Sequence, residues 1–168
     1  MKRRLSALCL ALALLVTLCA CGFASRTPAD GLTVYFLDVG QADSALAVCD
    51  GEAMLIDGGN VADAQYVVSA LAQRGVTALQ TVVATHCDED HCGGLAGVLA
   101  KYPAQRVLCS VTEYDTKAFS DFVKYADVQG RAIEQPQPGE HWTLGGAAVT
   151  VLGPLRDYED NNENSVVL

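Results

Sequence analysis

Strand-like apolar runs alternate with helix-patterned segments along most of this chain, and this alternation constrains the fold more than any other feature. The expected strands are six short apolar or β-branched runs, at residues 32–37, 45–49, 53–56, 79–84, 106–109 and 147–152. The expected helices have apolar side chains at helical spacing and cover residues 62–74, 93–102 and 116–129. Asp50-Gly51, between the second and third strands, predicts a hairpin turn because both positions accept positive φ. Strands that alternate with helices predict an α/β layered domain.

The stretch ATHCDEDHCGG, residues 84–94, directly follows the fourth expected strand and concentrates metal-binding side chains. We expect a loop that directs alternate side chains into one cavity, with His86 and Asp88 on one ion and Asp90 and His91 on another. Imidazole with carboxylate suits Zn, Mn or Fe, and the carboxylate share favours harder ions such as Mn. Two such ions would clamp a phosphate or carbonyl group and generate hydroxide at neutral pH.

A glycine pair, Gly93-Gly94, ends this stretch and would let the following helix pack close to the site. The alternative interpretation of the whole stretch is a solvated acidic loop with incidental histidines. The spacing of the histidines and carboxylates, together with the flanking segments, favours the metal loop.

Residues 1–20 have the pattern of a bacterial lipoprotein signal. A positive start is followed by the apolar run 5–18, which is too short for a comfortable membrane span. Small residues before Cys21 predict cleavage there and a lipid on the Cys21 sulfur, which would anchor the protein outside the cytoplasm on the bacterial cell membrane. An uncleaved anchor or ordinary secretion is the alternative. Residues 21–31 then form the lipidated cysteine and a short polar linker to one domain, residues 32–168.

The chain is acidic, with a formal net charge of −9 that becomes −12 without residues 1–20, whose three cations are lost. The remaining chain contains no basic run. Such a surface repels polyanions unless metal ions or a local basic patch intervene. The composition therefore counts against passive nucleic-acid binding, although it is compatible with a metal-dependent nuclease.

Four of the seven cysteines lie in the expected domain, and their irregular spacing does not indicate a disulfide-dense scaffold. Cys49 and Cys109 are interpreted as small buried hydrophobic residues. Cys87 and Cys92 have three alternatives, as thiolate ligands, as a disulfide across the loop, or as inert thiols.

Several segments resemble the metallo-β-lactamase superfamily, whose signature is H-x-H-x-D-H at the end of a strand. Within it, the chain is most similar to the exported metallo-hydrolase domain of the DNA-uptake competence protein ComEC and its free-standing relatives. The segments occur in the same order and are FLDVGQADSALAV (36–48), MLIDGG (54–59), VVATHCDEDHCGGL (82–95), VTVLGP (149–154) and NNENSVVL (161–168). The resemblance implies an αβ/βα sandwich, of which residues 32–168 form the N-terminal half to two-thirds. It also implies that the sequence is truncated, because the family takes further ligands from a segment after NSVVL.

The resemblance also assigns roles to individual residues. It implies four metal ligands, namely His86, Asp88, Asp90 and His91. Asp90 would in addition act on the bridging water as the catalytic residue, and Asp88 replaces the usual histidine as in the ComEC-like branch. Asp57 matches a buried aspartate that braces the ligand loop, and Asp43 belongs to a strand-end loop where it would touch substrate or support the ligands. A plain turn carboxylate is the alternative for both.

The implied function is an exported hydrolase with two divalent metal ions, zinc or manganese, that cleaves a phosphodiester, with DNA or a nucleotide as substrate by analogy. A small-molecule substrate stays open. The alternative from another class is a non-catalytic, degenerate surface lipoprotein that binds metal or a partner. Hydrolysis of β-lactams is a third alternative, which Asp88 and the flanking segments disfavour.

Overall fold

The fold is built on a six-stranded mixed sheet, seen in a computed structural model that describes residues 31–156 and 158–168. The strands lie side by side in chain order, as β1 (Leu32–Phe36), β2 (Ala45–Cys49), β3 (Glu52–Ile56), β4 (Leu79–Ala84), β5 (Ala104–Cys109) and β6 (Ile133–Glu134). The first three strands are antiparallel, and β3 to β6 run parallel. The predicted signal peptide and Cys21 lie outside the described residues.

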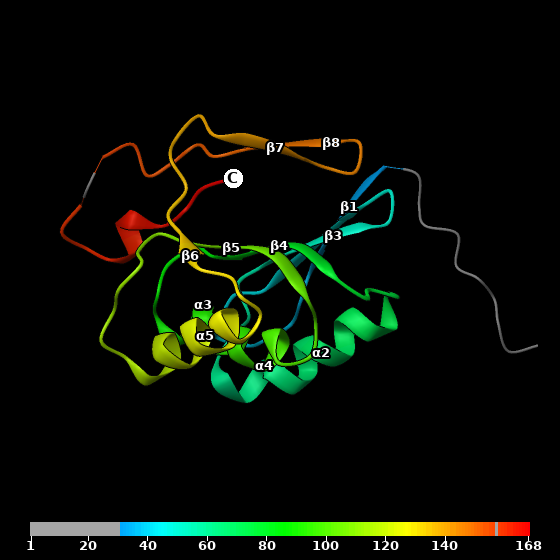
Figure 1. The fold of residues 1–168 in the computed structure, drawn as a ribbon, viewed down its shortest axis with the longest axis horizontal. Coiled ribbons are helices and arrows are strands. Elements are labelled where there is room, and N and C mark those ends of the chain that lie inside the picture. The colour runs from blue at the N-terminus through cyan, green and yellow to red at the C-terminus, as the bar shows by residue number, and fades with distance from the viewer. Residues whose placement is uncertain (1–30, 157) are drawn as a thin grey trace, which may run out of the picture.

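The helices cover one face of this sheet, and a small second sheet covers part of the other (Figure 1). The helical elements are the 3₁₀ turn η2 (Val61–Asp63), α2 (Ala64–Gln73), α3 (Glu89–Cys92), α4 (Leu95–Leu99), α5 (Lys117–Val128) and the 3₁₀ turn η3 (Asn162–Asn164). The second sheet is the antiparallel hairpin of β7 (His141–Leu144) and β8 (Ala147–Thr150). None of the described helices is both long and apolar enough to span a membrane.

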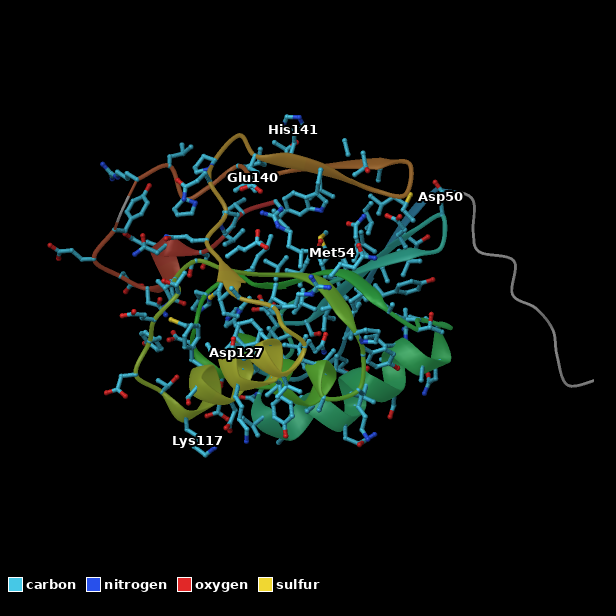
Figure 2. All side chains as sticks on the ribbon, viewed as in Figure 1. Asp50, Met54, Lys117, Asp127, Glu140 and His141 are labelled. Carbon is cyan, nitrogen blue, oxygen red and sulfur yellow. The ribbon has the colours of Figure 1, made fainter. Side chains whose placement is uncertain are left out.

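Two apolar cores lie on the two faces of the six-stranded sheet. The larger core joins the sheet to the helices and includes Leu55, Leu71 and Phe122, all fully buried. The smaller core lies between the two sheets and includes Met54 and Leu144. Met54 is seen between the sheets in Figure 2. Buried strands in the middle of the large sheet therefore hold their carboxyl ends in fixed positions.

The predicted α/β fold class is confirmed, and most element boundaries agree with the sequence patterns. The Asp50-Gly51 turn is also confirmed, with φ of 48° and 86° at its two residues. One local prediction is wrong, because residues 89–92 form the single helical turn α3 instead of continuing the loop. Its cause is local, since the N–H groups of His91 and Cys92 both donate to the carbonyl oxygen of Asp88.

The C-terminal segment folds back onto the sheet beside the end of β4. The Val166 N–H donates to the carbonyl oxygen of Thr85 at 2.8 Å, and Val166 is buried between the sheets. Val167 forms an antiparallel bridge with Gly153. This return brings the loop around η3 next to the residues that follow β4.

Strand β1 forms one edge of the large sheet and carries exposed apolar side chains. Leu32, Val34 and Phe36 are 55, 43 and 86% exposed. Tyr35 packs against the helix-side core, so the alternation of a strand turns these three side chains to the opposite face. The described residues leave this part of the face uncovered.

Candidate metal centre

The candidate site residues lie where β3 and β4 end. Asp57 follows β3, His86 lies two residues beyond β4, and α3 carries His91. Backbone bonds tie the loops together, because Gly58 N–H donates to the His91 carbonyl oxygen at 2.7 Å and Asp43 N–H to that of Asp90 at 3.1 Å. Parallel strands place their carboxyl ends at one edge of a sheet, so distant segments converge here.

The first candidate ligand pair is His86 with Asp88. Nε2 of His86 lies 3.6 Å from Oδ2 of Asp88, too far for a hydrogen bond. His86 is 2% exposed, and its Nε2 has no hydrogen-bond partner among the described residues. A buried polar atom without a partner is costly, so this nitrogen is suited to bind a cation. Two ligand atoms on one tetrahedral zinc ion lie about 3.3 Å apart, close to the observed separation.

The second candidate pair is His91 with Asp43. Their Nε2 and Oδ2 atoms are also 3.6 Å apart, and the Asp43 side chain is 75% exposed. The rings of His86 and His91 lie side by side, with centroids 3.9 Å apart. The structure therefore contains two nitrogen–oxygen pairs with the same spacing, of which the His86–Asp88 pair is the more buried and the His91–Asp43 pair the more open to solvent.

Asp57 and Thr85 form a polar floor beneath the histidines. Asp57 is 3% exposed and accepts hydrogen bonds from the Thr85 N–H and hydroxyl, both at 2.7 Å. Its Oδ2 also lies 2.9 Å from Nδ1 of His91. A proton on Nδ1 of His91 is fixed by this contact, which leaves Nε2 free to face Asp43.

The surroundings move the pKa values of the two histidines in opposite directions. The hydrogen bond to Asp57 is the main cause that raises the pKa of His91. Burial is the main cause that lowers the pKa of His86, and the neighbouring His91 acts in the same sense. The lowered pKa of His86 favours its neutral form, which is the form of imidazole that binds a metal.

Asp90 lies near the two histidines, since its charge acts on the pKa values of both, but no polar contact of its side chain is seen among the described residues. Its side chain forms no hydrogen bond or ion pair of 4.0 Å or less with any described residue, whereas Asp43 faces the Nε2 atom of His91. Asp90 as a metal ligand and as the catalytic residue stays a prediction. His141, the third histidine, begins β7 and points outward from the hairpin, away from the site (Figure 2).

The four cysteines of the domain are buried free thiols. Burial raises the pKa of Cys92 to about 12, and it is also the main cause that raises the pKa of Cys87. A thiol binds metal or reacts as the thiolate, so these shifts favour the inert alternative for both residues. Cys92 donates to the Cys87 carbonyl oxygen at 3.2 Å, which satisfies it within the ligand loop.

Four polar residues that the sequence did not assign to the site contact it. They are Thr85, Tyr114, Asn161 and Ser165, which reach the histidines or Asp88 through hydrogen bonds. Asn161 and Ser165 lie within NNENSVVL, so the resemblance marked their segment without giving them a role. Thr85 likewise lies within VVATHCDEDHCGGL without a role of its own, and Tyr114 lies outside every one of these segments.

The candidate ligands are of the chemical type that divalent metal ions bind, but they are few. Imidazole nitrogen with carboxylate oxygen is a combination that zinc and manganese accept. Within residues 31–156 and 158–168, however, no three histidine, cysteine, aspartate or glutamate side chains gather closely enough to bind one ion. Each pair contributes two ligands, whereas a zinc site takes three or four from the protein.

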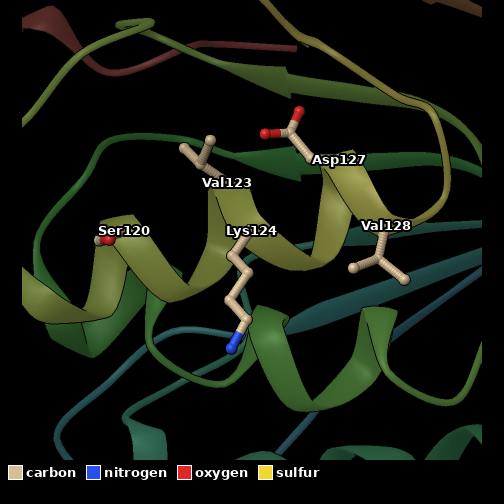
Figure 3. A pocket seen from close by; sticks show the side chains of 5 residues that line it. All are labelled: Ser120, Val123, Lys124, Asp127 and Val128. Atoms are coloured by element: carbon tan, nitrogen blue, oxygen red, sulfur yellow. The ribbon is translucent and has the colours of Figure 1, made fainter.

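A separate hollow of about 520 Å³ lies on α5, away from these residues. Figure 3 shows its lining, which comes from one side of this single helix: Ser120, Val123, Lys124, Asp127 and Val128. No candidate ligand lines it. It is a shallow surface feature without a converging set of polar groups.

Comparisons with known proteins agree with the fold. The family described as the metallo-beta-lactamase superfamily matches residues 37–159. Among solved structures, the subclass B3 enzyme MEM-A1 from a soil metagenome library has a TM-score of 0.58 and 21% identity, over 82% of this chain and 53% of that chain. A HARLDQ-motif metallo-β-lactamase mutant from Cronobacter sakazakii has a TM-score of 0.52 and 20% identity, over 74 and 54%.

The metallo-β-lactamase SMB-1, solved with mercaptoacetic acid, is similar at a TM-score of 0.52 and 18% identity, over 73% of this chain and 50% of that chain. At these identities the likeness concerns the fold. The chain spans about half the length of the solved structures it matches. No curated protein matches it significantly.

Proposed function

Since the chain belongs to the metallo-β-lactamase superfamily, we propose that it is a metal-dependent hydrolase of the ComEC-like group that cleaves phosphodiesters. The observation that carries the proposal is the buried Nε2 of His86, which has no hydrogen-bond partner among the described residues and faces Asp88 Oδ2 at 3.6 Å. A neutral imidazole next to a carboxylate is half of a metal site. A bound cation would offset the cost of burying this nitrogen unpaired.

The residues divide into ligands and supports. His86 and Asp88 would hold one ion, and His91 with Asp43 or Asp90 would hold a second. Bound divalent ions supply a Lewis acid and a source of hydroxide at neutral pH. Asp57 keeps a proton on Nδ1 of His91, and its burial keeps water away from the floor of the site.

This acidic chain would repel an anionic substrate unless bound metal ions attract it. The net charge is −9, and no described lysine or arginine forms a hydrogen bond or ion pair with a candidate ligand. Attraction of a phosphodiester would then come from metal cations held beside the carboxylates. DNA as the phosphodiester rests on the ComEC resemblance alone.

The location of the protein is a further part of the proposal. A lipid on Cys21 would hold the domain outside the cytoplasm on the cell membrane, and this rests on the sequence of residues 1–21. A substrate would then be extracytoplasmic.

The rival function is a non-catalytic surface module that binds metal or a partner. One observation favours it, namely that each of the two pairs offers only two ligands among the described residues. Weak binding of a single ion without turnover would fit such a module.

The metal content of the purified protein tests whether this chain has a metal site at all. We expect mass spectrometry of the purified full chain to find at least about one zinc or manganese ion per chain, because the paired nitrogen and oxygen atoms are already in place. His86→Ala/His91→Ala is expected to lose at least about nine-tenths of it, since both nitrogen ligands are gone. His141→Ala is the matched control, because this histidine lies outside the site. Metal-free wild-type protein would contradict the hydrolase and the metal-binding module, and would leave only a module that binds a partner.

Substrate choice is tested with the metal-loaded chain. We expect hydrolysis of bis(p-nitrophenyl) phosphate to exceed the rate of the double histidine variant by at least about tenfold, and a chromogenic cephalosporin to be left intact. Stoichiometric metal without phosphodiester hydrolysis would favour the surface module. Cephalosporin hydrolysis would contradict the phosphodiester assignment.

A further inference from the structure

We propose that Asn161 and Ser165 are positioning residues that determine which atoms of Asp88 and His86 face the metal position. The inference rests on the proposed function and deepens it. It makes the C-terminal loop around η3 part of the site, although this loop is more than 70 residues away from the ligands in sequence.

The loop is braced well enough to position its neighbours. Asn164 Nδ2 donates to the carbonyl oxygens of Tyr158 at 2.6 Å and Asp160 at 3.1 Å, and Asn164 Oδ1 accepts from Tyr158 N–H at 2.9 Å. Directly after the loop, Val166 bonds to the Thr85 carbonyl oxygen and is buried. Ser165 is thereby held one residue from an anchored position, next to the end of β4.

The tautomer of His86 follows from the hydroxyl protons of its two neighbours, Ser165 and Thr85. The Ser165 hydroxyl has one proton, which it donates to the Asn162 carbonyl oxygen at 2.7 Å. The Thr85 hydroxyl also has one, which it donates to Asp57 Oδ2 at 2.7 Å. Both hydroxyl oxygens lie 3.2 Å from Nδ1 of His86, and they have only lone pairs left to offer it. Nδ1 must therefore carry the proton, and the buried Nε2 presents a lone pair toward Asp88.

Asn161 fixes the carboxylate in a similar way. Its Nδ2 donates to Oδ1 of Asp88 at 2.8 Å, and the Tyr114 hydroxyl donates to the same oxygen at 3.3 Å. With Oδ1 occupied, Oδ2 is the oxygen turned to His86 Nε2. The Cys87 thiol donates to Asn161 Oδ1 at 3.2 Å, which determines which end of the amide faces Asp88. Cys87 thus has a structural use that requires the thiol to stay protonated.

The tautomer can be read without any metal. Long-range ¹H–¹⁵N NMR of the metal-free full chain, with ¹⁵N-labelled histidine, should show His86 protonated at Nδ1. Ser165→Ala removes one of two acceptors, and we expect a mixture with the Nε2 tautomer, whereas Ser165→Thr keeps the hydroxyl and should restore the wild-type pattern. An Nε2-protonated His86 in the wild type, or a Ser165→Ala spectrum identical to it, would overturn the role of Ser165.

Metal affinity provides the test of Asn161. Titration with zinc should show about 10- to 100-fold weaker binding for Asn161→Ala, the usual effect of losing a group that orients a ligand. Asn162→Ala is the matched control, because that side chain is exposed and forms no hydrogen bond within the described residues; its affinity should be unchanged. Equal affinity of wild type and Asn161→Ala would overturn the role of Asn161. A wild type that binds neither zinc nor manganese would defeat the proposed function and the role of Asn161 with it, while the tautomer measurement would still decide the role of Ser165.

Discussion

Gly94→Ala is expected to destabilise the protein by about 3 kcal/mol, at the upper end of what overpacking costs. An added Cβ would lie 2.0 Å from the carbonyl oxygen of Gly58, a contact that cannot persist. The obstacle is backbone, and this backbone is already fixed, since Gly94 N–H donates to the Gly59 carbonyl oxygen at 2.9 Å. Relief requires that the turn after β3 and the turn after α3 separate. Chemical denaturation measures the loss of stability.

The same separation should reduce metal binding, because Gly58 N–H also holds the carbonyl oxygen of His91. Gly153→Ala is the matched control, since its added Cβ would meet nothing closer than 3.4 Å, and we expect a change within about 0.5 kcal/mol. Equal denaturation midpoints for wild type, Gly94→Ala and Gly153→Ala would contradict the close packing of the two turns.

The fold could be predicted where the pattern of side chains is local. β2 and β4 are short apolar runs bounded by turn residues, and the structure has them at residues 45–49 and 79–84 as expected. β6 has only two residues, too few to show any alternation. β7 begins with His141 and Trp142 and depends on its pairing with β8, so it carries little signal of its own.

In the candidate site, too, the residues of a local motif could be predicted and those that only the folded chain brings together could not. His86, Asp88 and His91 could be chosen from one short motif, because ligands close in sequence leave a visible spacing. The position of Asp43 opposite His91 could not be predicted from such a motif. It depends on the hydrogen bond from the Asp43 N–H to the Asp90 carbonyl oxygen, which joins two loops of the folded chain. Ser165 is an ordinary residue in sequence, and only the return of the C-terminal segment gives it a partner.

Asp57→Asn is expected to cost about 1.5–3 kcal/mol, the usual range for hydrogen bonds to a charged group. The carboxylate accepts three hydrogen bonds, from the Thr85 N–H, the Thr85 hydroxyl and His91. An amide keeps the shape and tolerates the positive φ of 58° at this position, but it loses one acceptor and the charge. Denaturation of the metal-free protein measures the difference in stability between wild type and variant.

That difference should depend on pH in a definite direction. Asp57 raises the pKa of His91 in the folded state, so the stability it contributes through His91 is fully present below the unfolded histidine pKa of about 6.5 and is lost as pH rises through the raised value. The cost of Asp57→Asn should therefore be larger at about pH 5.5 than at about pH 8.5. The pKa of His86 is lowered mainly by burial, and the charge of Asp57 acts on it in the raising sense only as one of the smaller causes, so His86 adds a minor share in the same direction. In a His91→Gln background most of the pH dependence of the cost should therefore disappear. If it persists there undiminished, His91 is not the group that Asp57 stabilises, and the assignment of the Nδ1 proton beneath the site would have to be abandoned.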